Sequence, residues 1–363
     1  MKKYCIVSFC NIYILPYAKI YIDRIIQSGA ECILLFWDRD NVNGNNDIFP
    51  KCIKKCYEYK FTNSSTKYDR LKGYKGAIKY FIKDLSNNHY DGVIFLQTHA
   101  AVASYNVLKK LYKNRYIVDI RDWTLENIYI YRNFEKKCIQ NSYKTVISSP
   151  AYKSFLPDGD YVVAHNYTPI DDLTVKKIRE ECQIRKNTKQ LSISFIGTIR
   201  FLEMNKKILN IFSNDNRFRM GYYGTGAEAL EDYCLKNNIK NVDFFGSFPP
   251  EKTSEFYMKT NIINNLYGNH NKYLDYALSN KLYYSAQFYI PIIVCPQTYM
   301  EDISSKYNMG FVFDVNKDNE KDRLYEWFQM LDLDKFKNGC DCFLKKVKED
   351  NEVFYRLIDD FID

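Results

Sequence analysis

The sequence predicts an α/β protein of two domains in series, each built on a doubly wound parallel sheet. Three observations lead to this fold class. Short apolar segments alternate with amphipathic ones, which is the pattern of strands separated by helices. The alternation occurs twice, on either side of a charged stretch at residues 169–190. The length of 363 residues suits two domains that each bury a core.

The first half begins the alternation at the N-terminus. Apolar runs predict strands over residues 4–9, 32–37, 93–96 and 116–120. Apolar residues at helical spacing predict helices over residues 16–28, 68–85 and 101–112. Because helices separate these strands, parallel pairing is expected. We therefore assign residues 1–166 to a first domain.

The second half repeats the pattern after the charged stretch, which we interpret as a linker with a short exposed helix. Strands are predicted over residues 192–196, 218–223, 242–245, 262–266 and 290–294. Helices are predicted over residues 205–212, 227–237 and 350–362. The second domain therefore spans residues 167–345, and the C-terminal helix, residues 346–363, is expected to rejoin the first domain.

Composition excludes several classes of protein. No apolar run approaches the ~20 residues of a membrane-spanning helix, and the charged fraction of 26% excludes a low-complexity chain. Two lysines precede the first apolar run, but no cleavage site follows it, so a cytoplasmic protein is expected. The 11 cysteines lack zinc-finger spacing and are expected to be reduced thiols.

Three predicted strands of the second half end in glycine, at Gly197, Gly224 and Gly246. Ligands of open parallel sheets bind at the carboxyl ends of the strands. Glycine lets the backbone approach a ligand there, and the N-terminus of a following helix favours phosphate. A tight turn would explain any one of these glycines, but three in one domain indicate a nucleotide or phosphate site.

Five short motifs follow one another along the chain. They are Val118-Asp119-Ile120-Arg121-Asp122-Trp123, Ser194-Phe195-Ile196-Gly197, Gly221-Tyr222-Tyr223-Gly224-Thr225-Gly226, Asn241-Val242-Asp243-Phe244-Phe245-Gly246 and Ser279-Asn280-Lys281-Leu282-Tyr283-Tyr284. In this order they resemble glycosyltransferases of the GT-B fold, most closely the family 4 enzymes of bacterial capsule, exopolysaccharide and O-antigen biosynthesis. The resemblance implies two Rossmann-like domains facing a central cleft, and transfer of a hexose-like sugar with retention of stereochemistry.

The sequence departs from this family at Tyr284, where the enzymes usually carry a glutamate that contacts the donor. Asp275 is a candidate replacement for a second family carboxylate, about two helical turns earlier. Two alternatives therefore stay open. One is a non-catalytic GT-B subunit that binds a partner enzyme. The other is a sugar-nucleotide epimerase of the same fold, which would need more acid and base groups than we can place.

The resemblance implies that the second domain binds a nucleotide-diphosphate sugar. A diphosphate leaving group has to be stabilised, and a GT-B enzyme is expected to use cationic side chains and helix N-termini, with no metal and no other cofactor. Lys281 is the first candidate for a diphosphate contact, and Arg200 is the second. The other donor-binding candidates are Gly197, Gly224, Gly226, Gly246, Asp275 and Asn280.

The acceptor side needs a group that takes a proton from a hydroxyl. Asp122 follows a predicted strand and is the candidate catalytic base, with His99 as a second candidate catalytic residue. Asp119 and Arg121 are candidates for orienting the base or contacting the acceptor. A structural Asp–Arg pair and a structural histidine would explain the same residues.

Charge is distributed unevenly along the chain. Residues 1–150 carry 24 Lys+Arg and 13 Asp+Glu, a net charge of +11, whereas the remainder has a net charge of −3. A row of lysines lies along the helix predicted over residues 68–85, at Lys72, Lys75, Lys79 and Lys83. This half is expected to meet the anionic cytoplasmic membrane face peripherally, where a lipid-linked glycan acceptor would lie. Nucleic acid is not an expected partner because no binding motif accompanies the charge.

Overall fold

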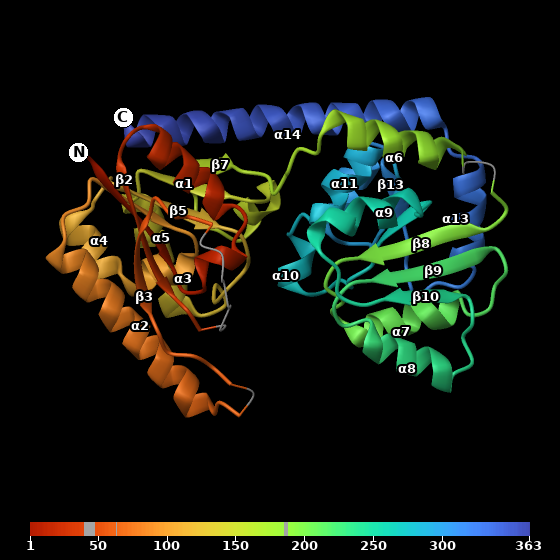
Figure 1. Cartoon of the computed structure of the whole chain (residues 1–363), viewed down its shortest axis with the longest axis horizontal. Coiled ribbons are helices and arrows are strands. Elements are labelled where there is room, and N and C mark those ends of the chain that lie inside the picture. The colour runs from red at the N-terminus through yellow and green to blue at the C-terminus, as the bar shows by residue number, and fades with distance from the viewer. Residues whose placement is uncertain (40–47, 63, 185–187) are drawn as a thin grey trace. The chain divides into compact units, whose positions relative to one another are not determined.

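The computed structural model describes residues 1–39, 48–62, 64–184 and 188–363. The chain forms two compact units (Figure 1). The first contains Met1–Asn166 together with Glu349–Asp363, and the second contains Tyr167–Lys348. Each unit is built on one parallel sheet, so the predicted pair of doubly wound α/β sheets is confirmed.

The sheet of the first unit has seven strands in the order β3-β2-β1-β4-β5-β6-β7. Their bounds are β1 (Lys3–Ser8), β2 (Glu31–Trp37), β3 (Ile53–Tyr57), β4 (Gly92–Phe95), β5 (Tyr116–Ile120), β6 (Lys144–Ile147) and β7 (Tyr161–Val163). The central strands are buried over nearly their whole length, as expected of a sheet covered on both faces. The direction of strand addition reverses between β1 and β4, which makes their carboxyl ends the switch point of this sheet.

Helices cover both faces of this sheet. They are α1 (Ala18–Gln27), α2 (Lys67–Asn87), α3 (Thr98–Ala103), α4 (Tyr105–Leu111), α5 (Tyr129–Asn141) and the C-terminal part of α14 (Leu333–Ile362). α1 and α14 share one core, in which Tyr21 packs edge-on against Phe354. α2, α4 and α5 contact one another in sequence and form the layer on the other face, because right-handed crossovers in the opposite direction place them there.

The second unit has six parallel strands in the order β10-β9-β8-β11-β12-β13. Their bounds are β8 (Leu191–Ile196), β9 (Phe218–Tyr223), β10 (Val242–Phe245), β11 (Ile262–Asn265), β12 (Ile292–Val294) and β13 (Gly310–Val312). The helices are α6 (Asp172–Ile184), α7 (Leu202–Ile211), α8 (Glu228–Lys236), α9 (Thr253–Met258), α10 (Lys272–Asp275), α11 (Asn280–Phe288), α12 (Tyr299–Lys306) and α13 (Glu320–Gln329). Here the switch point lies between β8 and β11.

Several elements differ from the prediction. The helix expected over residues 101–112 is two helices, because the backbone leaves helical geometry at Ser104. The helix expected over residues 350–362 is the end of α14, which begins at Leu333. The strands β3, β6, β7 and β13 were not predicted, because β3 has the half-polar sequence Ile-Lys-Lys-Cys-Tyr and the other three have only three or four residues each. Among the described residues, no helix combines the length and apolar character needed to cross a bilayer.

Candidate functional site

Lys281 lies at the switch point of the second sheet, where open α/β sheets bind their ligands. It is the second residue of α11, whose N-cap Ser279 accepts a hydrogen bond from the Lys281 backbone N–H. The Lys281 ammonium donates to the Tyr267 hydroxyl at 2.7 Å. It also lies 4.1 Å from the ring centre of Phe195, near the end of β8. Residues from three separate segments therefore hold this one cation.

The charge of Lys281 is buried with no counter-ion among the residues that the structure describes. The residue is only 6% exposed. In the described part of the chain, no carboxylate lies within 4.0 Å of its ammonium, whose neighbours are the Tyr267 hydroxyl and two aromatic rings. Burying an unpaired ammonium costs free energy, which an incoming anion would offset. The arrangement is thus that of a preformed anion site.

Two glycine turns lie side by side at the same edge of the sheet. The Gly197 backbone N–H donates a hydrogen bond to the Tyr223 carbonyl oxygen at 2.8 Å. The Ile199 backbone N–H donates one to the Thr225 carbonyl oxygen at 2.9 Å. A Cβ on Gly224 would lie 2.0 Å from the Gly197 carbonyl oxygen, so glycine is required there for the two turns to pack. A Cβ on Gly197, at φ +123°, would meet no described atom within 4 Å. Gly197 therefore borders open space, whereas Gly224 is needed for packing.

The remaining donor-side candidates differ in exposure and in their contacts. Arg200 is exposed, as is Asn280 at the first position of α11. Asp275 ends α10, and its buried Oδ1 has no hydrogen-bond partner in the described structure. A Cβ built on Gly226 would lie 3.0 Å from the Ile199 carbonyl oxygen.

The turn that contains Gly246 has an acidic neighbour. The Glu228 carboxylate lies 3.4 Å from a Cβ built on Gly246, and Glu231 is also in the first turn of α8. Two carboxylates at a helix N-terminus oppose the binding of a diphosphate. Of the three glycine turns, those at Gly197 and Gly224 are therefore the ones suited to phosphate.

Tyr284 occupies the position where the related motif has a glutamate. Its ring stacks on Phe288, with ring centres 5.8 Å apart, and lies 5.1 Å from the ring of Tyr257. Burial raises the pKa of its hydroxyl, which therefore stays neutral. Tyr284 is thus a packing residue of this unit, and it supplies no carboxylate.

At the switch point of the first sheet, His99 lies in the first turn of α3 with its ring 5.0 Å from that of Phe9. Gln97 joins the two strand ends, since its amide oxygen accepts from the Phe9 N–H at 2.9 Å. Burial, with a smaller contribution from the charge of Arg39, lowers the pKa of His99 to about 4. The His99 Nδ1 is buried and has no hydrogen-bond partner within the described residues. His99 is therefore a neutral imidazole at neutral pH.

Asp119 and Arg121 form a buried ion pair. The Arg121 Nε and Nη2 donate to the two Asp119 oxygens at 2.5 and 2.7 Å, and Nη1 donates to the Ala164 carbonyl and to Asn166. Tyr21 donates a further hydrogen bond to Asp119 at 2.8 Å. With these partners, the pair joins the ends of β5 and β7, so its geometry suits orientation of the following loop better than contact with a ligand.

Asp122 is exposed two residues beyond β5, and the next residue, Trp123, is buried against Phe155 with ring centres 4.9 Å apart. Burial and the charge of Asp119 raise the pKa of Tyr17, Arg121 lowers it, and the charge of Asp122 makes a smaller raising contribution. The Tyr17 hydroxyl donates to the carbonyl of Leu96, just after β4. Asp122 therefore lies within electrostatic range of Tyr17, the residue that contacts the end of β4.

Sequence reasoning missed two features of these edges. Tyr267, the hydrogen-bond partner of Lys281, follows β11, and the next residue is Gly268 with φ +112°. The signal that marked the other strand ends, a glycine just after the strand, was thus present here as well. The second missed feature is a buried carboxyl pair, Glu126 and Glu135, behind the loop that carries Asp122. Nothing in the sequence distinguishes these glutamates from solvated ones.

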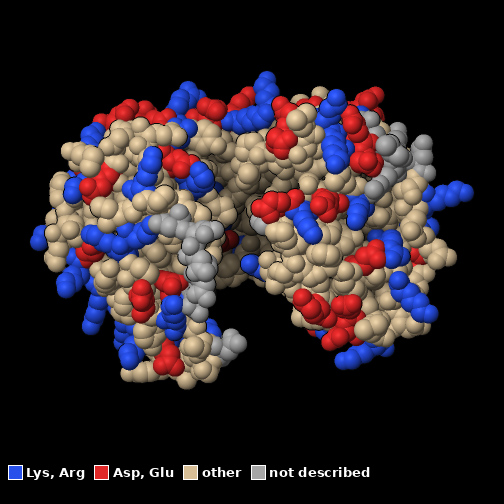
Figure 2. Space-filling model, viewed as in Figure 1, with Lys and Arg blue, Asp and Glu red and all other residues tan. Residues whose placement is uncertain are grey.

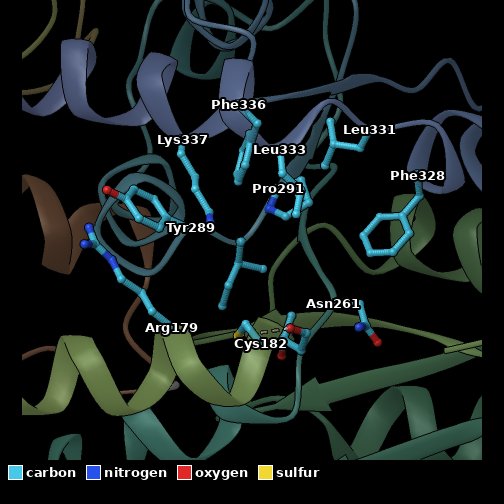
Figure 3. Close-up of a pocket in the computed structure, with 12 residues that line it drawn as sticks. Arg179, Cys182, Asn261, Tyr289, Pro291, Phe328, Leu331, Leu333, Phe336 and Lys337 are labelled. Atoms are coloured by element: carbon cyan, nitrogen blue, oxygen red, sulfur yellow. Dashed lines mark hydrogen bonds between the residues drawn. The ribbon is translucent and has the colours of Figure 1, made fainter. Parts of the chain in front are cut away.

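A pocket with about 530 Å³ of empty space, part of it open to solvent, lies elsewhere in the second unit (Figure 3). Thr260 and Pro291, which precede β11 and β12, line it, so it borders the amino ends of these strands. Figure 3 shows Arg179 beside the Tyr289 ring, with its guanidinium 3.5 Å from the ring centre. None of the predicted site residues lines this pocket.

No known family model matches the chain, and no curated protein matches it in sequence. Solved structures are similar over the whole chain. The sucrose-phosphate synthase of Thermosynechococcus elongatus has a TM-score of 0.70 at 9% identity, covering 99% of this chain and 96% of that one. Anabaena HepE in complex with UDP has a TM-score of 0.66 at 9% identity, with 98% and 99% covered. The lipopolysaccharide outer core galactosyltransferase WaaB has a TM-score of 0.58 at 14% identity, with 95% and 99% covered. At such identities the similarity shows the fold alone.

Proposed function

Because the chain has the GT-B fold, as the sequence predicted, we propose that it is a glycosyltransferase that uses a nucleotide-diphosphate sugar. The observation that carries the proposal is the buried Lys281 ammonium at the switch point of the second sheet, which has no counter-ion among the described residues. The HepE structures contain UDP, UDP with glucose, and UDP-glucose. A uridine nucleotide is therefore the first donor to test.

In this proposal, Lys281 contacts the diphosphate of the donor and stabilises the negative charge that grows as the sugar departs. The open space beside Gly197 admits a phosphate close to the backbone, and the exposed Arg200 supplies a second cation. Asn280 and the Gly224 turn border the same site, and Asp275, with its unpartnered buried oxygen, binds a hydroxyl of the donor. No metal and no other cofactor is required, because the cationic side chains neutralise the leaving group.

On the acceptor side, Asp122 takes the proton from the attacking hydroxyl. The Asp119–Arg121 ion pair orients its loop, and the neutral His99 contributes a hydrogen-bonding nitrogen. The sugar is transferred with retention, following the motif resemblance. The acceptor is a glycan, lipid-linked, in the synthesis of a bacterial surface polysaccharide at the cytoplasmic face of the membrane. The exposed row of Lys72, Lys75, Lys79 and Lys83 on α2 favours an anionic surface for that encounter.

Calorimetry with UDP and other nucleoside diphosphates tests the donor site. Lys281→Met keeps the buried stem and removes the charge, and it should weaken diphosphate binding by about 1.5–3 kcal/mol. Lys306→Met is a matched control, since Lys306 is an exposed lysine in the last turn of α12. Equal affinities of a folded Lys281→Met variant and the wild type would exclude Lys281 from the site. Nucleotide binding without any sugar transfer or hydrolysis would instead favour a non-catalytic binding subunit.

A further inference from the structure

The first unit exposes a run of large apolar side chains between β5 and the middle of α5. Leu125, Ile128, Tyr129, Ile130 and Phe134 have exposed fractions of 45%, 46%, 77%, 68% and 37%. We call these five residues the apolar segment. Scattered exposed apolar residues are normal, but five within ten positions are a local concentration of apolar side chains on the surface.

Phe134 packs against Tyr105 of α4, with ring centres 5.6 Å apart, but the fold does not account in this way for the more exposed Tyr129 and Ile130. α5 already buries another face, made of Tyr131, Glu135, Cys138 and Ile139. Ile128 is the N-cap of α5 and makes no side-chain capping bond there. Serine, threonine, aspartate or asparagine would satisfy the free N–H groups at this position, so isoleucine stabilises the helix less than the usual choice. The exposed apolar residues therefore lower stability and solubility, and no packing contact described within the unit explains the most exposed of them.

The helical layer to which the apolar segment belongs is strongly basic. α2, α4 and α5 form one layer, and their sequences contain eleven Lys and Arg residues against three Asp and Glu residues. Of the three acids, Glu135 is buried and Asp84 is paired with Lys55. Figure 2 shows basic side chains projecting along the edge of this unit formed by α2. A partner of this surface must therefore carry negative charge.

We propose that the apolar segment inserts into the interface of an anionic lipid bilayer, while the basic residues of α2, α4 and α5 contact the lipid headgroups. Tyrosine and isoleucine side chains at the start of a helix suit the boundary between headgroups and acyl chains, where an aromatic ring can bury its body and keep its hydroxyl hydrated. Lysines around such a site add electrostatic attraction to anionic lipid. This inference rests on the glycosyltransferase proposed above and adds an apolar anchor to the lysine row of α2.

The apolar segment begins close to the proposed catalytic base. Leu125 lies three residues after Asp122, in the same loop between β5 and α5. Insertion at Leu125 and Ile128 would bring the bilayer surface within one loop of the proposed base. An acceptor sugar carried on a lipid could then reach Asp122 without leaving the membrane.

Vesicle co-sedimentation tests the anchor. The full chain is mixed with vesicles of phosphatidylcholine alone or with 30% phosphatidylglycerol, over a series of salt concentrations. The double variant Tyr129→Ser/Ile130→Ser should bind anionic vesicles more than tenfold more weakly than wild type, because each buried large apolar side chain contributes about a factor of ten. Leu235→Ser/Met330→Ser is the matched control, since both residues are 76% exposed in the second unit. It should bind like wild type.

Two results would overturn the proposal. If wild type does not sediment with anionic vesicles at low salt, the apolar segment is a surface for a protein partner and not for lipid. If wild type sediments and the folded Tyr129→Ser/Ile130→Ser variant sediments equally, the binding is electrostatic and the apolar segment is not inserted. Nucleotide affinity measured on the same samples separates this outcome from failure of the proposed function, because the nucleotide is expected to bind the second unit.

Discussion

Replacing Glu135 with glutamine should stabilise the protein by about 2–3 kcal/mol more at pH 7 than at pH 5. Glu135 is fully buried on α5, and neither of its carboxyl oxygens accepts a hydrogen bond from a described donor. Its neighbour Glu126, 4% exposed, accepts from the Thr124 N–H at 2.5 Å. The Glu135 carboxyl is therefore the member of the pair that holds a proton.

The magnitude follows from the pKa of Glu135. Burial first, and then the charge of Glu126, raises this pKa from 4.5 to about 8, against a smaller lowering by Arg132. Between those two values the folded state holds a proton that the unfolded state has lost, so stability falls as pH rises, by about 1.4 kcal/mol per pH unit. At pH values above the pKa of Glu135 in the folded state, its titration no longer lowers the stability. Glu135 therefore lowers the free energy of unfolding by less than about 1 kcal/mol at pH 5 and by about 3 kcal/mol at pH 7.

The assay is thermal or urea unfolding of wild type and Glu135→Gln at pH 5, 6, 7 and 8. Glutamine has nearly the same shape and can donate an amide N–H to Glu126, but it does not titrate. Glu126 is coupled to Glu135, so the difference between the two proteins reports the titration of this carboxyl pair. For a unit of this size, the gain from pH 5 to pH 7 corresponds to about 5–10 °C in Tm.

An exposed acid provides the control. Glu352→Gln on α14 changes the same charge on the surface and should give a difference from wild type that does not vary over this pH range. If the difference between Glu135→Gln and wild type is also independent of pH, Glu135 is not protonated in the folded protein and the reasoning is refuted. A difference that grows above pH 8 would mean that its pKa lies higher still.

Three further predictions concern the strand ends. Asp122→Asn should lower the rate of sugar transfer about 10²–10⁴-fold without changing nucleotide affinity, and a near-wild-type rate in steady-state assays would exclude Asp122 as the base. Gly224→Ala should lower the free energy of unfolding in urea by more than about 2 kcal/mol, because the new Cβ would lie 2.0 Å from the Gly197 carbonyl oxygen. Gly197→Ala should lower it less, because its Cβ meets no described atom within 4 Å. Asp119→Asn leaves the buried Arg121 without its carboxylate and should destabilise the protein by about 3–5 kcal/mol, and an unchanged unfolding midpoint would contradict the buried pair.

Much of the fold could be predicted from local patterns. The runs that became β1, β2, β8 and β9 are apolar and short, and the helix α1 after β1 repeats apolar residues at a period near 3.6. These patterns depend only on neighbours in the chain. The half-polar β3, by contrast, is a strand because β2 pairs with it, from Ile33 to Trp37. Pairing of this kind is decided by the whole sheet.

The candidate site, like the fold, could be predicted only in part from the sequence. The sequence by itself determined that glycines follow several strands of the second half and that Lys281 is the first candidate for a diphosphate contact. Only the tertiary structure decided that Lys281 is buried between Tyr267 and Phe195, which lie 14 and 86 positions away along the chain. The same holds for the protonated Glu135. The physical reason is that the energy of a charge depends on burial and on the groups around it, and folding brings those groups from distant parts of the sequence.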